Sequence, residues 1–168
     1  MEAHIDEIIK KLDLKPHPEG GYYKETYRSK GVINLGSLGK AYGSDRHYST
    51  CIYFLLTSGN FSAFHKIKQD EIWHFYDGAP VELHTISENG DHAKFIIGRD
   101  LSSGQIPQLV VPGNAWFASK VLVPNSYSLV GCTVAPGFDF DDFVLASRSE
   151  LIQQFPTHEK LISTFTKD

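Results

Sequence analysis

The chain has 168 residues, which suits one domain, and 41% of them are apolar or aromatic, a fraction at which extensive disorder is not expected. Its 16 Lys and Arg residues against 20 Asp and Glu give a net charge of -4 with no basic run, which argues against nucleic acid as a partner. The longest apolar run, residues 51–56, is far shorter than the ~20 residues of a membrane-spanning helix. We therefore expect a cytoplasmic protein without membrane contact.

Short segments of strand-forming residues make up most of the chain. Apolar residues recur at helical spacing only near the ends, over residues 5–12 and 151–155, so we expect a helix at each end. We predict strands at residues 22–27, 49–56, 61–67, 71–76, 81–87, 92–97, 108–111, 116–119, 127–134 and 142–146. Many short strands separated by turns are typical of a sandwich or barrel, and the glycine-rich residues 31–45 are expected to form a mobile loop near its rim.

One spacing in the middle of the chain resembles that of a known superfamily. Gly59, His65, Ile67, Glu71 and Gly78 give the pattern G-x5-H-x-I-x3-E-x6-G. This pattern resembles the first motif of the cupin superfamily, in which a second histidine stands at the position of Ile67.

A second segment, residues 104–117, resembles the second cupin motif more loosely. Pro112 is present after two extra residues, and Phe117 stands where the motif has a histidine. Residues 14–22, 70–76 and 129–139 look like the hallmarks of one branch, the fifth cupin family.

This resemblance covers about residues 12–146 and leaves the reaction open. It implies an all-β fold, a double-stranded jelly-roll β-barrel with short flanking helices, which is often dimeric. We expect a single cupin domain over residues 1–168, with a helical C-terminal extension at residues 148–168.

The directions of two polar side chains follow from strand geometry. Because side chains alternate between the faces of a strand, Phe61, His65 and Ile67 are predicted to share one face, and Glu71 and Trp73 one face of the next strand. We expect His65 and Glu71 to point into one cavity, within about 6 Å of each other.

A divalent metal is allowed by this pair but not favoured, and no other cofactor is indicated. The resemblance implies a site of three histidines and one glutamate. Only His65 and Glu71 are present, because Ile67 and Phe117 occupy the other two positions. Two protein ligands rarely hold a divalent ion firmly. His74 lies three residues after Glu71 and should point to the opposite face of its strand.

The candidate catalytic residues are His65 and Glu71, because an imidazole with a carboxylate partner can take a proton from a carbon beside a carbonyl. The alternative is a hydrogen-bonded histidine of the core. The candidate substrate-binding residues are Trp73, Trp116, Tyr53 and Asp139. Both tryptophans also suit a purely structural role in the core.

Several other polar residues have structural interpretations. His17 and Glu19 lie in a Pro-rich turn, where a fixed surface loop and a contact at the rim of the barrel explain them equally. Arg46, His47 and the carboxylates of residues 139–143 are expected to be solvated.

Three functions stay open at this point. The first is a small-molecule-binding cupin without a strong metal requirement, such as an isomerase or epimerase of a sugar-like compound with His65 as the base. The second is a metal-dependent cupin enzyme, such as a dioxygenase, that uses His65 and Glu71 with a ligand from elsewhere. His84 would complete such a site only if its strand crossed the same opening. The third is a non-catalytic sheet protein.

The oligomeric state is predicted from one strand. Residues 51–56 are apolar on both faces, so the face outside the barrel needs a cover, either a terminal segment of the chain or a second copy. A two-fold homodimer is the commonest way for identical sheets to cover each other. Cys51 and Cys132 lack metal-binding or disulfide spacing and are expected to be packing residues.

Overall fold

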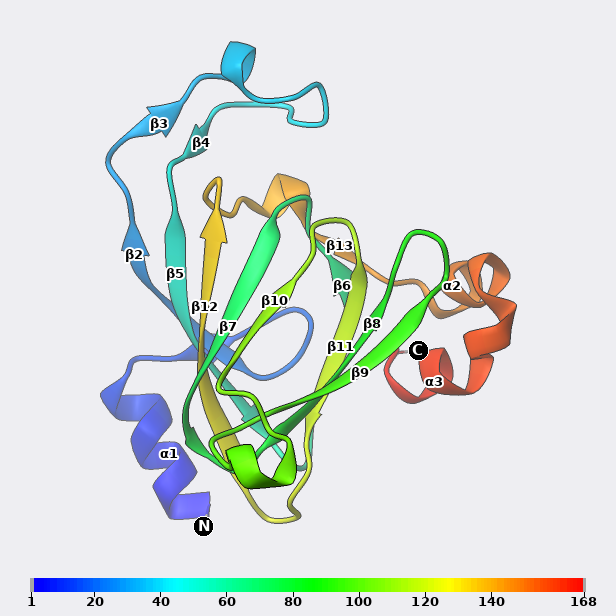
Figure 1. Cartoon of the computed structure of the whole chain (residues 1–168). Coiled ribbons are helices and arrows are strands. Elements are labelled where there is room, and N and C mark those ends of the chain that lie inside the picture. The colour runs from blue at the N-terminus through cyan, green and yellow to red at the C-terminus, as the bar shows by residue number, and fades with distance from the viewer. Residues whose placement is uncertain (1, 168) are drawn as a thin grey trace.

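The computed structural model describes residues 2–167 as two antiparallel sheets that face each other, with helices on their outer surfaces (Figure 1). The first sheet has the strand order β1 (Lys15–Pro16), β2 (Tyr22–Arg28), β5 (Thr50–Thr57), β12 (Tyr127–Ala135), β7 (Asp70–Gly78) and β10 (Gln108–Val111). The second sheet has the order β13 (Val144–Leu145), β6 (Phe61–Lys66), β11 (Trp116–Val121), β8 (Val81–Ile86) and β9 (His92–Ile97). The all-β jelly roll is confirmed, and its two sheets remain separate along their edges.

The predicted strand positions hold with one exception. Residues 142–146 shorten to β13, because Phe140–Asp142 forms a 3-10 turn before it. The Asp139 side chain caps this turn by accepting a hydrogen bond from the Asp141 backbone N–H. The chain therefore leaves β12 through a compact turn rather than an extended strand.

Residues 31–45, expected to be a loop, belong to a two-stranded arm that projects beyond both sheets (Figure 1). Its strands are β3 (Val32–Ile33) and β4 (Arg46–His47), with the short 3-10 turn Leu35–Ser37 toward its tip. At the base of the arm, His47 Nδ1 lies 2.6 Å from the Ser29 carbonyl oxygen. This contact joins the two sides of the arm where they leave the first sheet.

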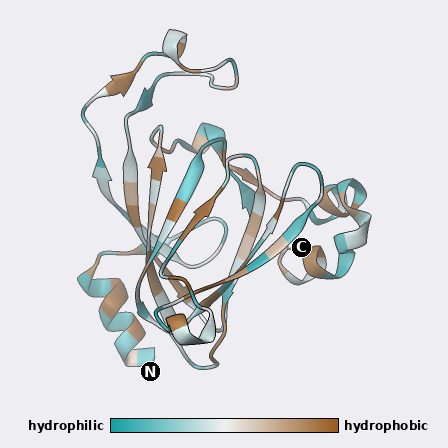
Figure 2. Ribbon diagram, in the orientation of Figure 1, coloured by the Kyte–Doolittle hydropathy of each residue, from teal (hydrophilic) through white to brown (hydrophobic). Residues whose placement is uncertain are grey.

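Helices cover part of each outer surface. α1 (Glu2–Lys11) packs Ile5, Ile8 and Ile9 against Leu55 and Tyr127 of the first sheet, and polar and apolar residues alternate along it (Figure 2). α2 (Arg148–Gln154), the 3-10 turn Pro156–His158 and α3 (Glu159–Thr164) pack against the second sheet around Phe64, Trp116 and Phe165. Within residues 2–167, every helix is too short to cross a lipid bilayer.

The space between the sheets holds the main core, which includes Phe54, Trp73, Leu83 and Phe117. A bulge in β6 alters the predicted pattern, because Phe117 pairs with His65 while Ser119 pairs with Ser62. Phe61 therefore packs on the outer cluster with Phe165, at 5.9 Å between ring centroids, instead of sharing a face with His65.

Candidate functional site

A cavity of about 380 Å³ lies between the sheets at the end nearest the arm. Its lining is His17, Glu19, Tyr23, Glu25, Arg28, Thr50, Ile52, Phe54, His65, Ile67, Glu71, Trp73, Cys132, Val134, Phe138, Asp139, Phe140 and Phe143. Aromatic and aliphatic side chains make the walls, and a few polar groups converge between them. This mixture is typical of a small-molecule site.

Glu19 is the centre of the buried polar network in this cavity. It is 6% exposed, and Oε1 accepts a hydrogen bond from Ser62 Oγ at 2.8 Å. Oε2 lies 3.0 Å from His65 Nε2 and 3.2 Å from His17 Nδ1. Burial alone would raise the pKa of Glu19, but the two histidines and Ser62 together hold it below its usual range.

Two glycines bring Glu19 into the interior. Gly20 has φ +122 and Gly21 has φ +71, conformations that side chains with a Cβ rarely adopt. A Cβ on Gly20 would lie 2.2 Å from the Phe61 carbonyl oxygen, so the turn presses directly against β6. The backbone of this turn also bonds to β6, where the Ala63 N–H donates to the Glu19 carbonyl oxygen.

His65 has a protein partner at both ring nitrogens. Nδ1 lies 2.7 Å from the Ala63 carbonyl oxygen, which only accepts, so Nδ1 carries a proton and donates it. Nε2 faces the Glu19 carboxylate at 3.0 Å. Both nitrogens of His65 therefore already face a protein partner in this arrangement.

Among the described residues, Glu71 is the buried carboxyl group of the cavity that has no counter-ion. It is 9% exposed, and no Lys, Arg or His in residues 2–167 lies within ion-pair distance of it. Burial and then the negative charge of Glu19 raise its pKa to about 7, an effect that the Cys132 thiol partly offsets. Glu71 can therefore both hold and release a proton near neutral pH.

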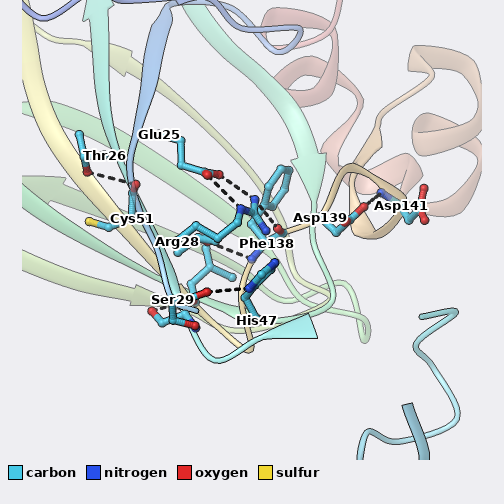
Figure 3. Close-up of polar contacts among 12 residues, drawn as sticks. Glu25, Thr26, Arg28, Ser29, His47, Cys51, Phe138, Asp139 and Asp141 are labelled. Atoms are coloured by element: carbon cyan, nitrogen blue, oxygen red, sulfur yellow. Dashed lines mark hydrogen bonds and ion pairs between the residues drawn. The ribbon is translucent and has the colours of Figure 1, made fainter. Parts of the chain in front are cut away.

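Residues that follow β12 line the cavity, and Figure 3 draws the contacts of two of them, Phe138 and Asp139. Arg28 makes two hydrogen bonds to the Glu25 carboxylate, at 2.9 Å and 2.7 Å, and a third to the Phe138 carbonyl oxygen at 3.2 Å. Figure 3 shows these contacts joining β2 to the segment that carries Asp139. The mouth thus combines one arginine with two carboxylates.

A family model described as "Cupin superfamily (DUF985)" matches residues 6–146. The chain belongs to this cupin family. The Saccharomyces cerevisiae protein YML079W is 30% identical over 167 residues, which span 94% of this chain and 83% of that protein.

Solved cupin-like structures share the whole architecture. A Shewanella oneidensis protein has a TM-score of 0.87 at 36% identity and covers 96% of both chains. A Leishmania major protein has a TM-score of 0.89 at 34% identity and covers 97% of this chain and 98% of its own. Oxalate decarboxylase from Bacillus subtilis, at 11% identity and a TM-score of 0.54, shares the fold alone.

The set of three histidines and one glutamate that the cupin resemblance implies as metal ligands does not fit this site. Ile67 lines the cavity where a histidine would stand, and the Phe117 ring lies 4.0 Å from the His65 ring. Both His65 nitrogens are already occupied, as described above. Across residues 2–167, no group of three or more His, Cys, Asp or Glu side chains has a spacing that would hold a metal ion.

Of the predicted site residues, the structure places four at the cavity and two elsewhere. His65, Glu71, Trp73 and Asp139 line it. Tyr53 lies on the outer face of the first sheet against Tyr76, at 6.1 Å between ring centroids. Trp116 packs in the outer cluster beneath α2, because residues at alternate positions of a strand face opposite sides.

Sequence reasoning did not include His17 and Glu19 in the site. The Glu-Gly-Gly sequence was the available signal, since a carboxylate followed by two glycines can be turned into the interior. Arg46 and Asp142 were expected to be solvated, and this was wrong. Both are 2% exposed and form a buried ion pair.

Two further histidines lie away from the cavity. His74 Nε2 lies 3.2 Å from Thr133 Oγ1 on the outer face of the first sheet. His84 bonds to His92 and Glu82 on the second sheet, so its strand does not cross the cavity mouth.

Proposed function

We propose that this cupin binds a small carbonyl compound, of the size of a sugar, and moves a proton on it as an isomerase or epimerase. The observation that carries the proposal is Glu71, a buried carboxyl group without a counter-ion that faces a cavity of about 380 Å³. A proton donor and acceptor is most effective when its pKa lies near the working pH, which the value of about 7 satisfies.

The roles of the neighbouring groups follow from their contacts. The Glu71 carboxylate would accept a proton from the carbon beside the substrate carbonyl, and the resulting acid would return it on the same face to the adjacent carbon while the hydroxyl proton moves to the other oxygen, as in an isomerase. An epimerase would need a second proton donor, such as water, on the opposite face of the substrate. Glu19 holds His65 and His17 in fixed orientations, so these residues shape the polar end of the site. Trp73 supplies an aromatic wall for the apolar face of a ring, and Asp139 lies at the mouth.

Hydrogen exchange into a bound sugar tests the proposal directly. The protein is incubated in D₂O with a panel of aldoses and ketoses, and deuterium at the carbon beside the carbonyl is followed by NMR. We expect catalysed exchange with at least one sugar and a loss of about 100-fold or more in Glu71→Gln. Tyr76→Phe, on the outer face of the sheet, is the matched control and should exchange at the wild-type rate.

Failure of this test has a clear meaning. Exchange that is unaffected by Glu71→Gln would overturn the role of Glu71. Binding without exchange in the wild-type protein would leave a binding protein and remove the isomerase. Stoichiometric iron, manganese, nickel or zinc that survives dialysis would favour the metal-dependent alternative, whereas we expect much less than one metal ion per chain.

A homodimer is the assembly that we propose for this cupin. On the outer face of the first sheet, Tyr76, which contacts Tyr53, is 48% exposed, and Val110 of the edge strand β10 is 50% exposed. A second copy placed on this face would bury these residues. Light scattering at micromolar concentration should give twice 18.8 kDa, and Tyr76→Glu should give the monomer; a wild-type mass near 18.8 kDa would rule the dimer out.

A further inference from the structure

Asp142 lies outside the cavity, at a point where three separate segments of the chain meet. Its side chain is fully buried. Arg46 donates to both oxygens at 2.7 Å, Gln69 Nε2 donates to Oδ2 at 2.7 Å, and Lys68 Nζ lies 2.9 Å from Oδ1. These contacts, together with the charge of Arg46, hold the pKa of Asp142 at about 2 although burial acts in the opposite direction.

The partners of Asp142 come from fixed parts of the fold. Arg46 lies in β4 at the base of the arm and also donates to the Ser44 and Asp45 carbonyl oxygens. Lys68 and Gln69 form the turn between β6 and β7. One carboxylate therefore ties the residues after β12 to the arm and to this turn.

Other residues of the same segment face the other way, into the cavity. We call residues 138–143 the mouth segment, because Phe138, Asp139, Phe140 and Phe143 all line the opening. The Phe143 ring lies 5.4 Å from the His65 ring and 5.8 Å from the His17 ring. The Phe140 ring stacks on His17 at 6.1 Å.

The other attachments of the mouth segment are weaker. The Phe138 N–H donates to Thr50 Oγ1 at 2.9 Å, and its carbonyl accepts from Arg28 at 3.2 Å. Arg28 is one-third exposed, and Phe140 is 49% exposed. Contacts that are exposed to water break more readily than buried contacts. The buried contacts of Asp142 are therefore the main anchor of the segment.

We infer that Asp142 is a positioning residue that holds the mouth segment over the cavity and so controls access to the groups inside it. The inference rests on the proposed function only in taking this cavity as the binding site. It assigns Asp142 no contact with the ligand. Its effect passes through Phe140 and Phe143, which cover the polar groups around His17 and His65.

Cys132 provides a reporter of access that needs no ligand. It lines the cavity and is 2% exposed, whereas Cys51, the second cysteine, lies on the outer face and is removed by Cys51→Ser. In this background, alkylation of Cys132 by iodoacetamide should be slow while the mouth segment is in place. Asp142→Asn should accelerate it by about tenfold or more, because the segment then opens without global unfolding.

A control separates local opening from a loss of overall stability. Asp77 lies in β7, about 20 Å along the strand from Glu71, and accepts a hydrogen bond from the Tyr127 hydroxyl. Asp77→Asn should leave the alkylation rate unchanged at the temperature of the assay. Urea unfolding first gives the stability of each variant. The two alkylation rates are then compared under conditions where the unfolded fraction is too small to contribute to either rate.

Two results would overturn the inference. The first is an Asp142→Asn rate equal to that of the parent, and the second is a rise no larger than its measured unfolded fraction explains. If Asp142→Asn does not fold, Arg46→Lys serves, since it keeps the charge but loses the two-bond geometry and should give a smaller acceleration. The assay contains no substrate, so its outcome is independent of the sugar-exchange test of Glu71.

Discussion

Two buried carboxyl groups in this cupin have opposite proton chemistry. Asp142 is 2% exposed and Glu71 is 9% exposed, so burial raises the pKa of both. For Asp142 the hydrogen bonds from Arg46, Lys68 and Gln69 outweigh burial and bring the pKa to about 2. Glu71 has no counter-ion among the described residues and is close to the negative charge of Glu19, so its pKa rises to about 7.

The difference shows that the partner, not the depth of burial, determines what a carboxyl group does in this fold. Asp142 stays ionised over the whole physiological range and can only hold structure together. Glu71 titrates near neutral pH beside an open volume and is suited to proton transfer. Substitutions that alter one partner should therefore give effects of different sign at the two sites.

Removal of the cation at Asp142 should have the largest effect. Arg46→Met leaves a buried carboxylate without its two-bond partner and should lower the free energy of unfolding by about 3–5 kcal/mol in urea at pH 7. Because the folded pKa of about 2 lies below the unfolded value of 3.8, the stabilisation by Asp142 is present above 3.8 and is lost as pH falls through 2. The acid-dependent loss should be smaller in the variant.

Arg28→Met is the matched control for that experiment. Arg28 also makes two hydrogen bonds to a carboxylate, but its side chain is 33% exposed and that of Glu25 is 39% exposed. Solvent screens such a pair, so the loss should stay below about 1 kcal/mol. Equal losses in the two variants would show that burial of the Arg46 pair has no energetic importance.

At Glu71 the expected effect is smaller and has the opposite sign. The folded pKa of about 7 lies above the unfolded value of 4.5, so protonation favours the folded state and wild-type stability falls as pH rises from 4.5 to 7. Glu71→Gln keeps the shape without the charge. It should raise the free energy of unfolding by about 2–3 kcal/mol at pH 8 and change it little at pH 4.

The same substitution at Glu82 should act in the opposite direction. Burial raises the pKa of Glu82, but contacts with His84 and Lys120 outweigh it and lower the pKa below its usual range. Glu82→Gln should therefore lose stability at pH 8. If Glu71→Gln were also less stable than wild type at pH 8, Glu71 would not be the group without a counter-ion that we describe.

The sequence allowed the fold and part of the site to be predicted. The spacing from Gly59 to Gly78 identified the cupin strands, and alternation correctly turned His65 and Glu71 toward one cavity. The alternation of side chains predicted the wrong face for Phe61, because the bulge in β6 adds a residue that no local sequence pattern predicts.

The partners of the two carboxyl groups could not be read from the sequence. Glu19 lies 46 positions before His65 in the chain, and Arg46 lies 96 positions before Asp142, so only the tertiary fold brings either pair together. Charged residues in turns are usually solvated, and that expectation failed at Arg46 and Asp142 because the two form a buried ion pair.

The smallest effect is expected at a third carboxylate, Asp77, which is exposed to solvent and holds one phenol. The Tyr127 hydroxyl donates to Asp77 Oδ2 at 2.6 Å, and this hydrogen bond, followed by burial, raises the pKa of Tyr127 to about 12. Since the folded value lies above the unfolded value of 10.0, the bond stabilises the protein below pH 10 and is lost as pH rises through 12.

Asp77→Asn should lower the Tyr127 pKa by about one unit and the free energy of unfolding by less than about 1 kcal/mol. The difference between tyrosinate absorbance titrations of the protein and of Tyr127→Phe isolates this phenol. An unchanged Tyr127 pKa in Asp77→Asn would mean that burial, rather than the carboxylate, sets its value, and the rule drawn from Asp142 and Glu71 would then not extend to the surface.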